Sequence, residues 1–253
     1  TQIRSSRAPK EGDELVFTFA NKKFFATVQG RKENFFILDW SVNPQSLFLK
    51  YGQIPLPPYM TREVEKLDED RYETVYADPK KRESVAAPTA GMHFDQELLS
   101  NLQNNGIEFG YVNLHVGAGT FQPGKTDNIE DHEIHKELVE VDLKLINQVK
   151  KVKASGGKII AVGTTSMRAL ETAFQNEPSE FIGETDLFIF PGYKFKVVDH
   201  MITNFHLPKS SLLMLVAAFI GYKKMMDIYK IAIQEEYRFL SYGDAMLLKD
   251  DAF

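Results

Sequence analysis

The chain has 253 residues, of which 43% are hydrophobic and 26% are charged, and its formal net charge is −5. This composition is typical of a folded globular protein, and the acidic balance argues against broad non-specific binding to nucleic acid. Cysteine is absent, which excludes disulfides, thiolate metal sites and cysteine nucleophiles and fits a reducing compartment.

The sequence shows no membrane or secretion signal. The longest uninterrupted apolar run, residues 212–220, is far shorter than the roughly 20 residues that a membrane-crossing helix needs. The opening residues, 1–7, contain no apolar signal-peptide core. We therefore expect a cytoplasmic location and no membrane contact. A monomer is also expected.

Residues 12–50 predict a small antiparallel β module, because three runs of aromatic and β-branched residues are separated by polar turns. The runs are 14–19, 24–28 and 34–38. Three prolines between residues 51 and 59 forbid a helix and indicate a stiff, extended connector. We place the domain boundary there, with a small β domain at 1–52 and a larger α/β domain at 53–253.

From residue 71 onward, strand patterns alternate with helix patterns, which predicts an α/β fold with largely parallel pairing. The expected helices are 95–104, 143–154, 164–173, 211–219 and 226–240, and the expected strands are 107–116, 158–162 and 186–190. In such folds, the residues just past the carboxyl ends of strands line the ligand crevice.

Three stretches rich in glycine, threonine and histidine fall at that kind of position. They are 85–94, 114–121 and 159–166. Small side chains let a ligand approach the backbone closely. The three stretches therefore predict one shared pocket.

Residues 163–166 lie between a buried strand and a helix start. Their N–H groups and hydroxyls can bind a carboxylate or a phosphate, with Arg168 as a fork to the same anion. The alternative is an ordinary Ser/Thr helix cap. The stretch does not match the phosphate loop G-x-x-x-x-G-K-[ST], which disfavours the use of nucleoside triphosphates.

Three histidines, His93, His115 and His206, stand in segments rich in Gly, Thr, Pro or Asn. A histidine transfers protons near pH 7, since its unperturbed pKa is about 6.5. The alternative for each is a hydrogen-bonded packing residue. Asp244 follows an amphipathic helix, where it either accepts a hydrogen bond in the pocket or simply marks the helix end. Residues 131–135 lack the H-E-x-x-H spacing, so we expect no metal site there.

Eight ordered blocks of the chain together resemble the S-adenosylmethionine:tRNA ribosyltransferase-isomerases of queuosine biosynthesis. The blocks are 54–59, 71–77, 86–94, 114–121, 162–168, 190–193, 203–210 and 238–246. The resemblance implies an α/β barrel-like catalytic domain into which a small antiparallel β-barrel domain is inserted. It also implies a segment before the β module, with an Asn-Asn-Thr-Arg strand, to which this chain has no counterpart. We therefore expect N-terminal elements of the larger domain to be missing from this chain.

The resemblance further implies an enzyme that uses S-adenosylmethionine as a ribosyl donor. The ribosyl moiety is transferred to 7-aminomethyl-7-deazaguanine at the tRNA wobble position and isomerised, which gives epoxyqueuosine-tRNA and releases adenine and methionine. S-adenosylmethionine is then a co-substrate, tRNA bearing the deazaguanine is the partner, and no metal is expected.

This chemistry assigns roles to the candidate residues. The sulfonium acidifies the hydrogens on the 5′-carbon, so that a positioned base can form an ylide, and His93, His115 and His206 are the candidates for proton transfer. We expect Thr164, Thr165 and Arg168 to hold the methionine carboxylate. The other expected substrate contacts are Thr89, Gly91, Asn204 and Asp244, together with Gly117, Gly119 and Thr120, against whose backbone the nucleoside would lie.

Two other functions fit parts of the pattern. An enzyme that cleaves adenosine or S-adenosylmethionine and acts on small molecules would use the same pocket chemistry, but it would release adenine without RNA. A plain RNA-binding module built on the β domain would be indifferent to S-adenosylmethionine. The binding module leaves the histidine-bearing strand ends unexplained.

Overall fold

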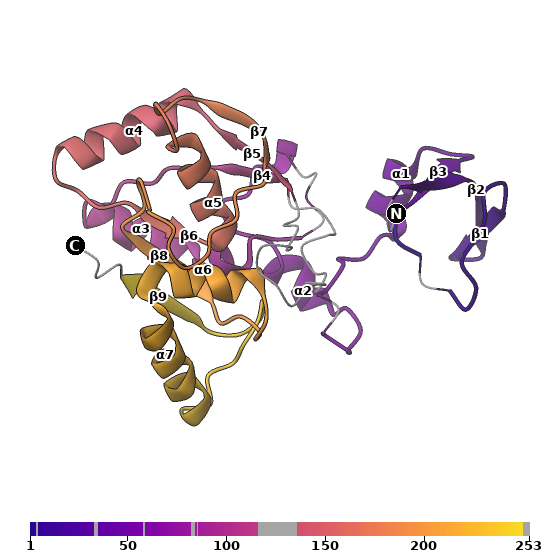
Figure 1. Ribbon diagram of the computed structural model, residues 1–253. Coiled ribbons are helices and arrows are strands. Elements are labelled where there is room, and N and C mark those ends of the chain that lie inside the picture. Colours follow the sequence, from indigo (N-terminus) through magenta and orange to yellow (C-terminus); the bar gives the residue numbers. More distant parts are fainter. Residues whose placement is uncertain are drawn as a thin grey trace. The chain divides into compact units, whose positions relative to one another are not determined.

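The computed structural model describes residues 1–3, 5–32, 35–57, 59–81, 84, 86–115 and 136–249. The chain divides into two compact units, Thr1–Ile54 and Pro55–Phe253, and Figure 1 shows the first of them in indigo and purple. The division falls in the proline-containing connector. Three predicted nucleoside contacts, Gly117, Gly119 and Thr120, and the segment 131–135 lie outside the described residues.

The first unit is a three-stranded antiparallel sheet with one helix. Its elements are β1 (Glu14–Phe19), β2 (Lys22–Lys32), β3 (Phe35–Trp40) and α1 (Pro44–Tyr51), and the strand order is β1-β2-β3. Aromatic side chains hold the helix to the sheet, since the rings of Phe19 and Tyr51 stack with centroids 5.3 Å apart. The predicted antiparallel pairing is confirmed. The described strands of this unit form an open sheet and not the expected β-barrel.

The second unit contains two further three-stranded sheets. One orders β4 (Asn113–His115), β5 (Glu137–Val141) and β7 (Phe181–Thr185), and the other orders β6 (Ile160–Val162), β8 (His200–Asn204) and β9 (Ala245–Lys249). Among the described strands, only β6 and β8 pair in parallel. The fold is therefore mixed α/β, the expectation of largely parallel pairing is wrong, and the described strands close no barrel.

The helices of the second unit are α2 (Lys66–Arg71), α3 (Gln96–Asn104), α4 (Leu143–Ala154), α5 (Thr164–Ala173), α6 (Ser211–Ile220) and α7 (Tyr222–Gln234), with short 3-10 turns η1 (Pro79–Lys81) and η2 (Thr89–His93). Four of these helices, α3 to α6, lie close to their predicted positions, α7 begins and ends earlier than expected, and α2 was not expected. Polar caps start several of them; the Asp142 side chain, for example, accepts from Leu145 N at the start of α4.

The strand expected at 186–190 does not form, because the chain pairs with β5 through the preceding residues, β7, instead. Leu187 N donates to the Thr185 hydroxyl, which turns the chain away from the sheet, and Ile189 is buried in the core. The strand expected at 107–116 is similarly reduced to the short β4. Apolar content therefore did not decide which residues of these two segments pair in a sheet.

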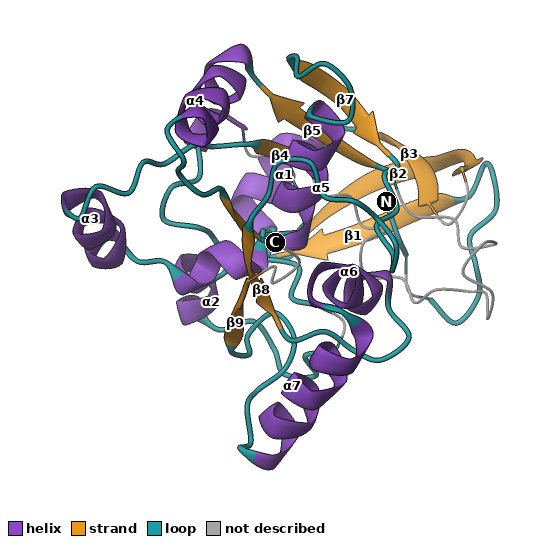
Figure 2. Cartoon of the chain, turned by 60° about the vertical axis from the view of Figure 1, so that its left-hand side comes forward, coloured by secondary structure: helices purple, strands orange, loops and turns teal. Residues whose placement is uncertain are grey.

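The core of the second unit is centred on α5. Met167 and Ala169 of this helix are fully buried, as are Met201 of β8 and Val216 of α6. In Figure 2, α3, α4 and α7 lie at the outside of this unit and α5 lies nearer its centre. The start of α5 is consequently held firmly beside the sheet that contains β6 and β8.

Candidate active site

One edge of the β6-β8-β9 sheet gathers several predicted site residues. Val162 of β6 pairs with Ile202 of β8 in parallel, and Asn204 pairs with Ala245 of β9 in antiparallel register. The carboxyl ends of β6 and β8 therefore meet the amino end of β9, and η2 packs against β8. This sheet edge, made by η2, the start of α5, the end of β8 and the start of β9, is the candidate site.

Asn204 joins Thr89 and His93 across the sheet edge. The Thr89 hydroxyl lies 3.1 Å from Asn204 Oδ1, and Asn204 Nδ2 lies 3.0 Å from His93 Nε2. Asn204 is only 4% exposed, so its amide is fixed by these two partners. In this arrangement Nε2 accepts a hydrogen bond, and the neutral ring carries its proton on Nδ1.

The charge state of His93 follows from its surroundings. Burial lowers the pKa of His93, and the negative charge of Asp244 opposes this shift. Asp244 Oδ2 accepts from Arg238 N at 2.7 Å, and the Arg238 guanidinium lies 3.3 Å from Oδ1. These hydrogen bonds lower the pKa of Asp244. At pH 7 the site therefore holds a neutral imidazole near a carboxylate.

The start of α5 lies at the same edge. Gly163 has φ +93°, a conformation that favours glycine, and its N–H donates to Ile202 O at 2.8 Å. No side chain caps the helix at Gly163, so the Ser/Thr cap that the sequence left open is not formed. The first N–H groups of a helix attract anions, and here Thr164 and Thr165 supply them.

His206 lies on the other side of β8. Its Nε2 is 3.0 Å from the Thr203 hydroxyl, and its backbone N–H donates to the hydroxyl of Tyr229 in α7. Because side chains alternate along a strand, Thr203 and Asn204 point to opposite faces of the sheet. Burial lowers the pKa of His206 to about 4. The structure therefore separates His206 from His93 and favours the packing alternative for it.

His115 lies in the other sheet of the unit. Its Nε2 is 3.5 Å from Oε1 of Glu140 on β5. The other oxygen of Glu140 accepts from Lys81 and from Asn113, each at 2.7 Å. These contacts, led by the hydrogen bond from Lys81, lower the pKa of Glu140 to about 2. The three histidines thus lie in three different settings, and only His93 is at the sheet edge.

Arg168 is placed differently from the expectation. It is 5% exposed, its Nη1 lies 2.8 Å from Glu137 Oε2, and its Nε donates to Leu187 O at 2.9 Å. Burial lowers the pKa of this guanidinium. An anion could reach Arg168 only if these contacts broke, so the geometry favours an internal strut between α5 and β5.

Gly91 is needed for packing inside the unit. A Cβ at this position would collide with the Tyr76 hydroxyl and the Thr74 methyl. The space beside Gly91, which was predicted to admit a ligand, is therefore filled by the side chains of Tyr76 and Thr74. The role of Gly91 is to let η2 lie against Tyr76.

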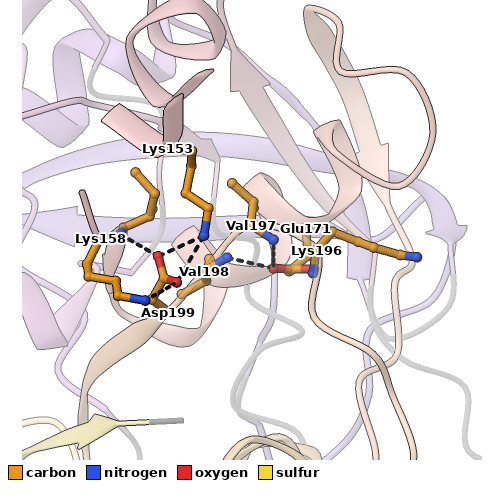
Figure 3. Close-up of polar contacts among 8 residues, drawn as sticks. Lys153, Lys158, Glu171, Lys196, Val197, Val198 and Asp199 are labelled. Atoms are coloured by element: carbon orange, nitrogen blue, oxygen red, sulfur yellow. Dashed lines mark hydrogen bonds and ion pairs between the residues drawn. The ribbon is translucent and has the colours of Figure 1, made fainter. Parts of the chain in front are cut away.

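Two carboxylates that the sequence analysis missed, Glu171 and Asp199, hold the segment just before β8 in place (Figure 3). Glu171 of α5 is fully buried and accepts from Lys196 N, Val197 N and Val198 N at 2.8, 3.1 and 3.0 Å. Asp199 accepts from Ile159 N at 2.7 Å and from Lys153 Nζ. A sequence signal did exist for Glu171, because an acid four residues after the buried Met167 falls on the apolar face of the helix.

Within the described ranges, no group of three or more His, Asp or Glu side chains is placed to hold a metal ion. In the same part of the chain, no helix is long and apolar enough to cross a membrane.

The sequence of the chain matches a known protein family. A family model described as queuosine biosynthesis protein matches residues 1–248. The chain is 49% identical over 249 residues to the S-adenosylmethionine:tRNA ribosyltransferase-isomerase of Acinetobacter baylyi, covering 97% of this chain and 72% of that protein. It is 49% identical over 250 residues to the enzyme of the same name in Xylella fastidiosa strain M23, covering 98% and 71%.

A solved structure is similar as well. The S-adenosylmethionine tRNA ribosyltransferase of Thermotoga maritima matches with 34% identity and a TM-score of 0.54. The match covers 94% of this chain and 65% of that chain, so this chain spans about two thirds of its length.

Proposed function

This chain belongs to the queuosine biosynthesis protein family, and from that premise we propose that it acts as an S-adenosylmethionine:tRNA ribosyltransferase-isomerase. In this reaction the ribosyl moiety of S-adenosylmethionine moves to 7-aminomethyl-7-deazaguanine at the tRNA wobble position and is isomerised. The products are epoxyqueuosine-tRNA, adenine and methionine. The observation that carries the proposal is the 49% identity to enzymes of this name over 97% of the chain.

We assign the proton transfer at the 5′-carbon to His93. Its ring is neutral at pH 7 because burial lowers its pKa, and it is held through Nε2, so Nδ1 is the nitrogen that faces the reaction. For Nδ1 to act as a base, Nε2 must carry the proton, and the Asn204 amide must then turn its oxygen toward it. The Thr89 hydroxyl can follow this rotation, because a hydroxyl both donates and accepts.

The donor carboxylate is assigned to the start of α5. Its first N–H groups, at Thr164 and Thr165, have no side-chain cap, and the helix dipole favours an anion there. Arg168 is left as a strut, since its guanidinium already binds Glu137. Gly117, Gly119 and Thr120 remain the predicted nucleoside contacts, outside the described residues.

The partners follow from the reaction. S-adenosylmethionine is the co-substrate and precursor-bearing tRNA is the acceptor, and we propose that the reaction takes place in the cytoplasm. We propose that the protein acts as a monomer. The proton transfers can be carried by side chains, and the proposed reaction needs no metal.

The test is mass spectrometry of tRNA containing the deazaguanine precursor after incubation with the protein and S-adenosylmethionine. We expect a mass shift to epoxyqueuosine, with adenine release that depends on the RNA, and neither with His93→Gln. Equal adenine release without RNA would instead indicate a small-molecule enzyme. RNA binding that is indifferent to S-adenosylmethionine, with no conversion, would indicate a binding module.

A further inference from the structure

A pair of stacked tyrosines borders the candidate site. Tyr72, which ends α2, is only 6% exposed, and its ring lies parallel to that of Tyr242, with centroids 5.8 Å apart and 3° between the planes. Tyr242 precedes Asp244 by two residues. The hydroxyl of Tyr72 lies near Ala87, which precedes Thr89 by two residues. Tyr72 therefore contacts two segments, at Tyr242 and at Ala87, that continue within two residues into the candidate site.

The two hydroxyls have different partners. Tyr242 Oη donates to Asp68 Oδ1 at 2.9 Å, and Asp68 is also bound by Arg62 at 2.6 and 2.7 Å. The Tyr72 hydroxyl, in contrast, is buried, and within the part of the chain that the structure describes its proton has no acceptor; only the backbone N–H of Ala87 is directed at its oxygen. A buried hydroxyl without an acceptor costs free energy, so such groups in proteins usually meet a ligand or an ordered water.

The protonation state of the Tyr72 hydroxyl limits which chemical groups of a ligand it can bind. Burial raises the pKa of Tyr72 to about 12, so the group stays protonated at neutral pH and acts as a neutral donor. A neutral donor in a buried, aromatic setting suits the neutral acceptors of a nucleoside, the adenine nitrogens and ribose oxygens. RNA phosphates are bound mainly by cationic side chains.

We propose that Tyr72 contacts the substrate, with its hydroxyl donating a hydrogen bond to an acceptor atom of the S-adenosylmethionine nucleoside. This assignment rests on the proposed function. It gives Tyr72 a role in binding the donor and gives Tyr242 a structural role as its stacking partner, held by Asp68.

The experiment compares Tyr72→Phe with the matched variant Tyr242→Phe. Titration calorimetry with S-adenosylmethionine should show about tenfold weaker binding for Tyr72→Phe, since one hydrogen bond to the ligand is lost. Its melting temperature should fall less than that of Tyr242→Phe, because the Tyr72 hydroxyl has no internal acceptor to lose. Tyr242→Phe should melt at a lower temperature, because Asp68 loses a donor.

Unchanged binding by Tyr72→Phe, or a melting temperature lowered as much as in Tyr242→Phe, would overturn the assignment. If the parent protein binds S-adenosylmethionine but converts no precursor-bearing tRNA, the proposed function fails, while weaker binding by Tyr72→Phe still supports the contact. If the parent protein converts tRNA and Tyr72→Phe binds normally, the contact alone fails. A parent protein that does not bind S-adenosylmethionine would overturn both.

Discussion

The side-chain amide of Asn204 lies 3.0 Å from Nε2 of His93, although the two residues are 111 positions apart in the chain. Asn204 is the last residue of β8 and His93 is the last residue of η2, so the contact exists because η2 packs on the end of that strand. The orientation and the proton position of the imidazole therefore depend on a residue from a distant part of the sequence.

A carboxylate in place of this amide should shift the pH dependence of the reaction. Burial lowers the pKa of His93, so the neutral base should persist at pH 7 and be lost only as the pH falls below 6.5. In Asn204→Asp, the carboxylate stabilises the imidazolium and raises that pKa. The acidic limb of kcat/KM for adenine release should therefore move to higher pH.

The matched variant is Asn204→Ala, which removes the contact without adding charge. We expect it to lower kcat by about 10- to 100-fold while the acidic limb keeps its position, since orientation is lost but no charge is introduced. Superimposable pH profiles for the parent protein and Asn204→Asp would contradict the assignment of His93 as the base.

Arg168→Ala should destabilise the second unit. The substitution leaves the Glu137 carboxylate, 5% exposed, without its guanidinium, and breaking a buried ion pair costs about 3–5 kcal/mol. Urea denaturation followed by circular dichroism is the measurement. Fluorescence would mislead, because the single tryptophan, Trp40, lies in the first unit.

The double variant Glu137→Leu with Arg168→Met separates charge from packing. It should recover much of the lost stability, because no charge is then left buried. A different result, normal stability of Arg168→Ala with at least a tenfold higher KM for S-adenosylmethionine, would restore the predicted contact between Arg168 and the donor carboxylate.

Glu171→Gln should loosen the entry into β8. The amide keeps the shape of the side chain, and its oxygen can still accept from Val197 N and Val198 N, but its NH₂ group then faces Lys196 N. We therefore expect a loss of about 1–3 kcal/mol from one N–H group without an acceptor. Hydrogen exchange should show the largest loss of protection at Lys196. Tyr193→Phe, which removes a single hydrogen bond to Glu171, should cost only about 0.5–1.5 kcal/mol. Equal losses in both variants would contradict this account.

The sequence was sufficient for features that local chemistry determines. Ser210 caps α6 and Gly221, with φ +83°, ends it, as expected of these residue types. The antiparallel runs of the first unit also follow from alternation and turn residues. The approach of Thr89 and His93 to the start of α5 was expected, because the small-residue stretches 85–94 and 159–166 were placed at one pocket. Asn204 and Asp244 lie outside those stretches and were expected there on other grounds.

Features set by distant partners were not predictable in the same way. Arg168 looked like an anion fork because it follows a helix start, but its partner, Glu137, is a strand residue 31 positions away. Asp199 accepts hydrogen bonds from Ile159 N and Lys153 Nζ, which lie 40 and 46 positions away, so the residues next to Asp199 in the sequence do not indicate these partners. The strand expected at 186–190 had the right apolar content, yet pairing with β5 selected residues 181–185. Partner choice, and not propensity, decided each case.

His206 should make the stability of the protein depend on pH. Its pKa is about 4 in the folded protein and about 6.5 when unfolded, so the unfolded chain binds more protons between these values. The contribution of His206 to the free energy of unfolding is therefore fully present above pH 6.5. It declines as the pH falls toward 4, by about 3 kcal/mol in total. Denaturation curves at pH steps across this window should show the slope.

The control variant is His206→Gln, which keeps an amide for Thr203 but does not titrate. It should flatten the slope of stability against pH by about 1.4 kcal/mol per pH unit. His93, whose pKa is also lowered, contributes in the same direction, so the comparison between the two proteins carries the test. An identical slope in both would mean that the pKa of His206 is the same in the folded and the unfolded protein.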